Sequence, residues 1–172
     1  MSRLPIIFAV LLSAAGVRAA EDTVKLFADY WAAQMRLSPL TATFYGERGY
    51  DDQLDDNSLA GRAARKASDE ALLERTKALD RKTLSPEERL SVSVMKTLLD
   101  DELEGLALPF REFEVDHIDG GQSWIPTVIQ AAQPMKDVKD AEALEKRLEA
   151  VPLYFARHRE NLASGLKTGR VA

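Results

Sequence analysis

The chain has 172 residues, which is enough for one packed domain or for part of a larger one. It contains no cysteine, so disulfides, thiolate metal sites and a lipid anchor on cysteine are excluded. Its formal net charge of −5 argues against nucleic acid as a partner, because phosphates attract a basic protein face.

The first 19 residues are typical of a secretory signal peptide. Arg3 precedes a short apolar run, and the small residues Val17 and Ala19 stand three and one positions before the cleavage point at Ala20. The run is too short to span a membrane, and a buried N-terminal helix is the alternative. We therefore predict a signal peptide at 1–19 and a helical segment at 20–172 that is periplasmic or secreted.

Asp22 to Leu37 is predicted to form a strongly apolar helix. Its hydrophobic residues fall in two adjoining helical stripes, so the helix needs cover on most of its circumference. Pro39 disfavours helical geometry at Ser38 and is expected to end the helix. The next segment, Tyr45 to Asp52, combines two glycines, aromatic residues and adjacent acids, which indicates an ordered, packed loop.

A second helix is predicted from Leu59 to about Asp80, with Asn57 or Ser58 as its N-cap. The segment is rich in alanine, which favours helix. The alanines form a shallow apolar face that is expected to pack closely on a neighbouring helix. These residues are Ala60, Ala63, Ala64, Ala67 and Ala71.

A third helix is predicted to begin at Pro86 and to run to about Leu106. Ser85 and Glu88 have the spacing of a capping box, and proline suits the first helical position. The acidic run from Asp100 to Glu104 could bind a cation, but such runs are more often a solvated helix face.

The remainder of the chain is predicted to contain one extended segment and three helices. Phe110 to Ile118 alternates between two faces, as an extended chain does. A Gly-Gly turn leads into a short helix that Pro134 closes. Pro152 is expected to divide the last helical stretch into a pair, and Gly169 to cap its end. The predicted fold is mainly α: a multi-helix bundle or array with one short extended segment.

The sequence contains no complete catalytic or metal-binding motif. Neither His117 nor His158 belongs to the H-E-x-x-H pattern that binds zinc on a helix. His117 lies between two aspartates that could orient it as a base, although an ordinary loop histidine has the same pattern. Trp124 follows the Gly-Gly turn and could line a cleft or anchor the core. His117 and Trp124 are the candidate cleft residues; no catalytic, metal-binding or cofactor-binding residue is assigned.

Several motifs, in order along the chain, resemble a bacterial family catalogued as domain of unknown function 885. The matching segments are Tyr30-Trp31, Leu37-Ser38-Pro39, Ala42-Thr43, Gly46, Gly49-Tyr50-Asp51-Asp52-Gln53-Leu54, Leu84 to Leu90 and Leu148 to Val171. The family is exported or lipid-anchored, largely helical, and looks like a zinc metallopeptidase of the H-E-x-x-H type. Its zinc motif lies downstream of the region that these segments cover.

The resemblance implies that this chain is the N-terminal fragment of an exported metallopeptidase-like protein and part of a larger helical domain. It would form part of a helical substrate-cleft wall for peptides and would be inactive alone, with zinc held only in the missing C-terminal part. The alternative is a self-sufficient exported helical binding module without enzymatic activity. In either case, apolar helix faces that remain exposed would favour self-association.

Overall fold

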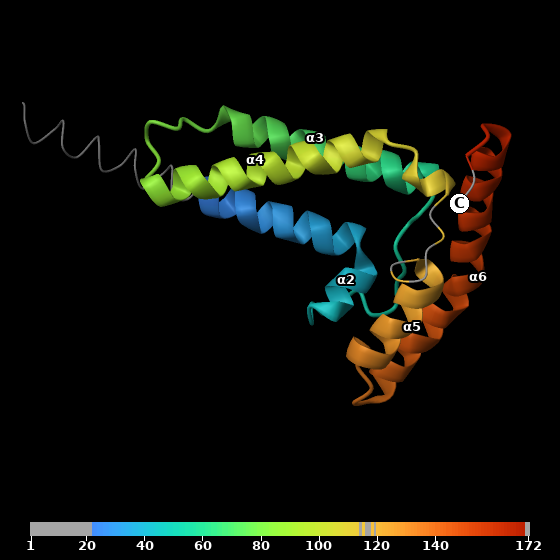
Figure 1. Ribbon diagram of the computed structural model, residues 1–172. Coiled ribbons are helices and arrows are strands. Elements are labelled where there is room, and N and C mark those ends of the chain that lie inside the picture. Colours follow the sequence, from blue (N-terminus) through green and yellow to red (C-terminus); the bar gives the residue numbers. More distant parts are fainter. Residues whose placement is uncertain (1–21, 114, 116–117, 119, 171–172) are drawn as a thin grey trace, which may run out of the picture. The chain divides into compact units, whose positions relative to one another are not determined.

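The computed structural model describes residues 22–113, 115, 118 and 120–170, and all regular structure in them is helical. This confirms the prediction of a mainly α chain. The predicted signal peptide at 1–19 lies outside the described residues. The elements are a helix over residues 22–37, α2 (Pro39–Phe44), α3 (Leu59–Ala78), α4 (Pro86–Ala107), the 3-10 helix η1 (Phe110–Glu112), α5 (Gly121–Ala132) and α6 (Val138–Lys167) (Figure 1).

The described chain divides into two compact units. Unit 1 comprises residues 22–31 and 67–104, and unit 2 comprises residues 32–66 and 105–170. None of the described helices is long and apolar enough to cross a membrane.

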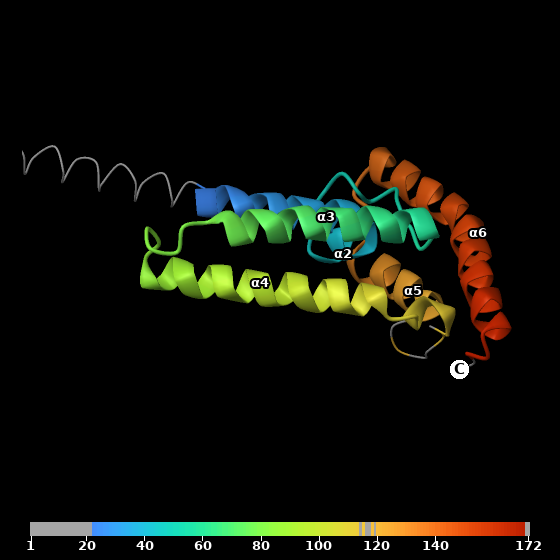
Figure 2. The same ribbon diagram turned by 90° about the horizontal axis from the view of Figure 1, so that it is seen from above.

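Unit 1 consists of three helical segments that lie side by side in both views (Figures 1 and 2). They are the first helix, the later turns of α3, and α4. Leu84 and Val92 are buried in its core, with Phe27 and Leu79 packed against them. The first helix is only partly covered, because Val24 and Trp31 are 69% and 43% exposed.

The start of α4 follows the predicted capping box. The Ser85 amide donates to the Glu88 carboxylate at 2.7 Å, and the Glu88 amide donates to the Ser85 hydroxyl at 3.2 Å. These hydrogen bonds hold the pKa of Glu88 below its usual value. The prediction from local spacing is therefore confirmed, because both partners belong to one helical turn.

One apolar stripe of α4 is exposed. Leu90, Val94 and Leu98 are 66%, 51% and 44% exposed, whereas Val92 and Leu99 on the opposite side are buried. Self-association through such a stripe stays a prediction.

The prediction that the alanine face of α3 packs on a neighbouring helix is wrong. All five alanines are exposed, and the buried residues are Asp69, Leu72, Leu73 and Thr76. A leucine removes more apolar surface from water than an alanine does, so the leucine pair determines which side of α3 faces the core. The N-cap prediction holds at Ser58, whose hydroxyl accepts from the Gly61 amide at 3.1 Å.

A short helix follows the break at Ser38, where only a loop was predicted. The first helix ends at residue 37 as expected, but Pro39 occupies the first position of α2. Proline is compatible with that position because its missing N–H would have no helical partner there. Leu40 of α2 is buried with Ile125 and Val128 of α5, and these three residues form a hydrophobic cluster in the core of unit 2.

The C-terminal stretch is one helix rather than the predicted pair. Pro152 lies inside α6, which is 30 residues long and curved (Figure 2). Proline removes one helical hydrogen bond and bends a helix, but packing on both sides of Pro152 keeps α6 continuous: Val151 and Tyr154 pack against the core of unit 2. Gly169, at φ +75°, follows the C-cap as predicted.

The predicted extended segment at Phe110 to Ile118 begins instead as η1, and the described residues contain no strand. The alternating pattern predicted the wrong local structure, because η1 packs against α6 and buries Glu112. The Arg170 guanidinium donates to the Glu112 carboxylate at 2.5 Å, and the Thr168 hydroxyl donates to it at 3.3 Å. Arg170 is the main cause of a lowered pKa of Glu112.

From the lowered pKa of Glu112 we predict that the chain loses stability in acid. A group whose pKa is lowered in the folded state stabilises the protein above its unfolded pKa of about 4.3, and this contribution disappears as the pH falls toward the folded pKa. Between about pH 5.5 and pH 3, the urea midpoint of the native chain should therefore fall more than that of Glu112→Gln. Glu149→Gln, an exposed control on α6, should behave like the native chain. Equal acid sensitivity of the native chain and Glu112→Gln would contradict this assignment.

Candidate functional site

A buried arginine on α6 holds the loop that follows α2. The Arg147 side chain is completely buried. It donates to the backbone oxygens of Tyr50 and Gln53 at 2.6 and 2.9 Å, and to the Thr43 hydroxyl at 2.7 Å. It also donates to the side-chain oxygen of Gln133 at 2.5 Å. Four acceptors on three parts of the chain thus converge on one guanidinium, which confirms the prediction of an ordered loop.

Burial and the neighbouring carboxylates shift the pKa of Arg147 in opposite directions. Burial lowers the pKa of Arg147, and the carboxylates of Asp51, Asp55 and Asp52 oppose that shift. Burial also raises the pKa of Asp55, against a hydrogen bond from the Leu40 amide and the charges of Arg65 and Arg147. The result is a desolvated but hydrogen-bonded charge cluster at the base of the loop.

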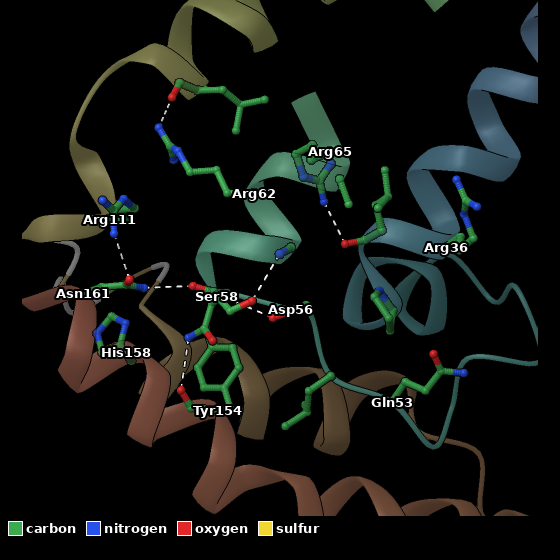
Figure 3. A pocket seen from close by; sticks show the side chains of 17 residues that line it. Arg36, Gln53, Asp56, Ser58, Arg62, Arg65, Arg111, Tyr154, His158 and Asn161 are labelled. Atoms are coloured by element: carbon green, nitrogen blue, oxygen red, sulfur yellow. Dashed lines mark hydrogen bonds between the residues drawn. The ribbon is translucent and has the colours of Figure 1, made fainter. Parts of the chain in front are cut away.

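The loop leads to a cavity of about 360 Å³ within unit 2 (Figure 3). Its walls come from the end of the first helix, the loop before α3, the first turns of α3, η1 and α6. Four arginines line it among the described residues, whereas Asp56 is the one lining carboxylate. The arginines are Arg36, Arg62, Arg65 and Arg111.

The two arginines of α3 donate to neutral acceptors. Arg65 donates to the Leu37 backbone oxygen at 2.8 Å and to the Ser38 hydroxyl at 2.6 Å. Arg62 donates to the backbone oxygens of Leu106 and Leu108. These hydrogen bonds hold the two guanidiniums in place at the cavity wall.

A chain of amide hydrogen bonds forms the opposite wall of the cavity. Arg111 donates to the side-chain oxygen of Asn161 at 3.0 Å, and the Asn161 amide donates to the backbone oxygen of Asn57 at 2.9 Å. The Asn57 side chain in turn donates to the backbone oxygen of Tyr154 at 3.1 Å. The ring of Tyr154 stacks on His158, with ring centroids 6.4 Å apart. This wall therefore joins three segments that are distant in sequence.

The lining carboxylate is held by partners at the edge of the cavity. Asp56 accepts from the Ser58 amide at 3.0 Å and from Arg157 at 2.9 Å. Burial alone would raise the pKa of Asp56, but the hydrogen bonds from Ser58 and the charge of Arg157 outweigh it and leave the pKa lowered. Asp56 is thus ionised and already paired.

Of the two predicted cleft residues, the structure describes Trp124, and Trp124 does not line this cavity. Trp124 packs against the core of unit 2 with its ring 5.4 Å from Phe44, and it is not among the lining residues. Trp124 is therefore the core anchor that the sequence allowed as an alternative. His117 lies outside the described residues. The lining residues that sequence reasoning missed, such as Arg62 and Arg111, lie in ordinary charged patterns that carry no signal of a shared cavity.

No group of three or more potential metal-binding side chains occurs in the part of the chain that the structure describes.

Fold and site together define a mainly α protein with an arginine-lined cavity braced by a buried arginine. Residues 39–172 match the family model described as a bacterial protein of unknown function (DUF885). The match covers most of the chain, so the chain belongs to this family. All lining residues of the cavity except Arg36 and Leu37 fall within the matched range. No curated protein and no solved structure matches the chain.

Proposed function

We propose that this chain forms part of the substrate-cleft wall of an exported, metallopeptidase-like protein and holds a peptide there. The observation that carries the proposal is the cavity in the family-matched region. Its volume of about 360 Å³ lies within the range of small-ligand sites. Its walls offer the guanidinium and amide groups with which proteins hold a peptide backbone.

In this proposal the residues of the chain bind and orient, and they do not cleave. Peptide cleavage by a metallopeptidase requires a zinc motif such as H-E-x-x-H, which is absent from the sequence of this chain. The catalytic zinc would be held by residues outside these 172. Export is proposed from the signal-peptide pattern of residues 1–19.

The alternative is an exported helical binding module without enzymatic activity. One observation favours it: residues of a single compact unit line the whole cavity. The two proposals differ in genomic context, because an H-E-x-x-H motif encoded directly downstream would support the first, and its absence would support the second.

Peptide binding can be tested with a matched pair of variants on α3. Ala64 lines the cavity, whereas Ala63 is also exposed and does not. Short peptides should bind the purified chain with dissociation constants of roughly millimolar or below, as measured by NMR titration. Ala64→Leu should weaken binding because it fills part of the cavity, and Ala63→Leu should not. Absence of saturable binding, or equal effects of the two variants, would contradict the proposal.

A further inference from the structure

We propose that one exposed face of α6 pairs with the same face of a second copy of this chain, so that the two α6 helices pack antiparallel about a two-fold axis at Phe155. The face, called the α6 stripe below, consists of Leu144, Leu148, Phe155, Leu162 and Leu166. Two features carry the proposal: the stripe is spaced symmetrically about Phe155, and the charges beside its two halves have opposite signs.

The α6 stripe is apolar, largely exposed and symmetric. At 3.6 residues per turn, its five residues fall within an arc of about 40° on the helix. Leu148, Phe155 and Leu166 are 50%, 36% and 65% exposed. Two leucines precede Phe155 by 7 and 11 positions, and two follow it by 7 and 11 positions. A two-fold axis requires this spacing, because each residue before the centre in one copy meets the residue equally far after the centre in the other.

A different side of α6 packs against the core of unit 2. Val151 and Tyr154 contact that core, and Arg147, Asn161 and Gly165 are buried. No residue of the α6 stripe lines the arginine-lined cavity, so pairing through the stripe uses a surface separate from the proposed peptide site. The stripe extends over about 33 Å at a rise of about 1.5 Å per residue, which is several helical turns.

The charges beside the α6 stripe favour an antiparallel second copy. Glu145 and Glu149 flank its first half, Arg159 and Lys167 flank its second half, and all four are exposed. Glu160 lies farther round the helix, away from the stripe. In an antiparallel pair the acidic half of each copy faces the basic half of the other, whereas in a parallel pair like charges would meet. Arg159 stands closest to the apolar residues, where its aliphatic stem can pack while its charged end stays in solvent.

The exposed stripe of α4 lacks this complementarity. It is centred on Val94, with Glu87 seven residues before and Asp101 seven residues after. An antiparallel second copy would bring Glu87 against Asp101, and like charges in contact oppose association. Of the two stripes, only that of α6 is therefore complementary to itself.

Sedimentation velocity of the purified chain at increasing concentration tests the proposal. The chain should convert from monomer to dimer with a dissociation constant of roughly micromolar, because one helix pair is a small interface. Phe155→Lys places two like charges on the two-fold axis and should raise the dissociation constant about a hundredfold or more. Leu153→Lys is the matched control: Leu153 is 55% exposed on the same helix but lies outside the stripe, so the constant should change less than about twofold.

Several results would overturn the interface. A chain that stays monomeric up to about 1 mM would do so, and so would a dimer that Phe155→Lys leaves intact. Loss of the dimer in Val94→Lys but not in Phe155→Lys would assign self-association to α4. If circular dichroism shows that Phe155→Lys loses helix, Leu166→Lys repeats the test at a more exposed position of the stripe and should weaken the dimer about tenfold or more.

Single introduced cysteines determine the orientation, because the chain contains no cysteine of its own. Under mild oxidation Phe155→Cys should form a disulfide-linked dimer, since the two copies of residue 155 meet at the axis. Leu166→Cys should not, because its two copies would lie about 33 Å apart in an antiparallel pair. Cross-linking of both variants would indicate a parallel pair, and any pattern other than linkage of Phe155→Cys alone would overturn the proposal.

Discussion

Replacing Arg147 with methionine is expected to lower the free energy of unfolding by about 3–5 kcal/mol, the largest stability effect that we predict for this chain. Methionine fills much of the arginine volume but donates no hydrogen bond. The backbone oxygens of Tyr50 and Gln53 would lose their Arg147 donor inside the protein, and so would the side chains of Thr43 and Gln133. Each buried acceptor left without a partner costs about 1–3 kcal/mol. Because a domain is stable by only about 5–15 kcal/mol, this loss approaches unfolding.

Urea unfolding followed by circular dichroism measures the effect, and hydrogen exchange of the loop amides locates it. Arg159→Met removes an exposed arginine from the same helix and should stay within about 0.5 kcal/mol of the native chain. Arg147→Lys separates charge from geometry, since a lysine has three donors at one point and cannot reach all four acceptors. If Arg147→Lys had the unfolding free energy of the native chain, charge alone would matter. If Arg147→Met had it, Arg147 would not anchor the loop.

Gly165→Ala is expected to destabilise the chain by about 1–3 kcal/mol, although alanine is the better helix former. A Cβ atom at Gly165 would overlap the backbone oxygen of Glu112, where α6 crosses η1. Backbone cannot move aside as a flexible side chain can, so α6 and η1 would have to separate. The hydrogen bonds from Thr168 and Arg170 to Glu112 would then lengthen as well.

Gly105→Ala is the matched control on α4. A Cβ atom there meets nothing within 4 Å, so alanine should stabilise the helix by about 0.5–1 kcal/mol. If close packing decides the result at Gly165, the melting temperature should fall in Gly165→Ala and rise in Gly105→Ala. An increase in melting temperature in both variants would show that α6 and η1 do not pack as described.

Helix boundaries with local causes could be predicted from the sequence. The capping box of Ser85 and Glu88, the cap at Ser58 and the terminal Gly169 all depend on residues within about one turn of one another, so their chemistry can be recognised from spacing alone. Features that depend on distant partners were missed or predicted wrongly. Pro152 lies within a continuous helix, and the alanine face of α3 is exposed.

The sequence by itself determined that this chain is mainly helical, where several helices begin and end, and which family it belongs to. Only the tertiary structure decided that Arg147 is buried, because its acceptors on the loop and α2 lie 94 to 104 residues away, and a charged residue on a helix otherwise predicts a solvated face. The cavity likewise could be found only in the tertiary structure. Arg36, Arg62 and Arg111 are unremarkable surface charges in sequence, and they share a site because packing in unit 2 brings distant segments around one space.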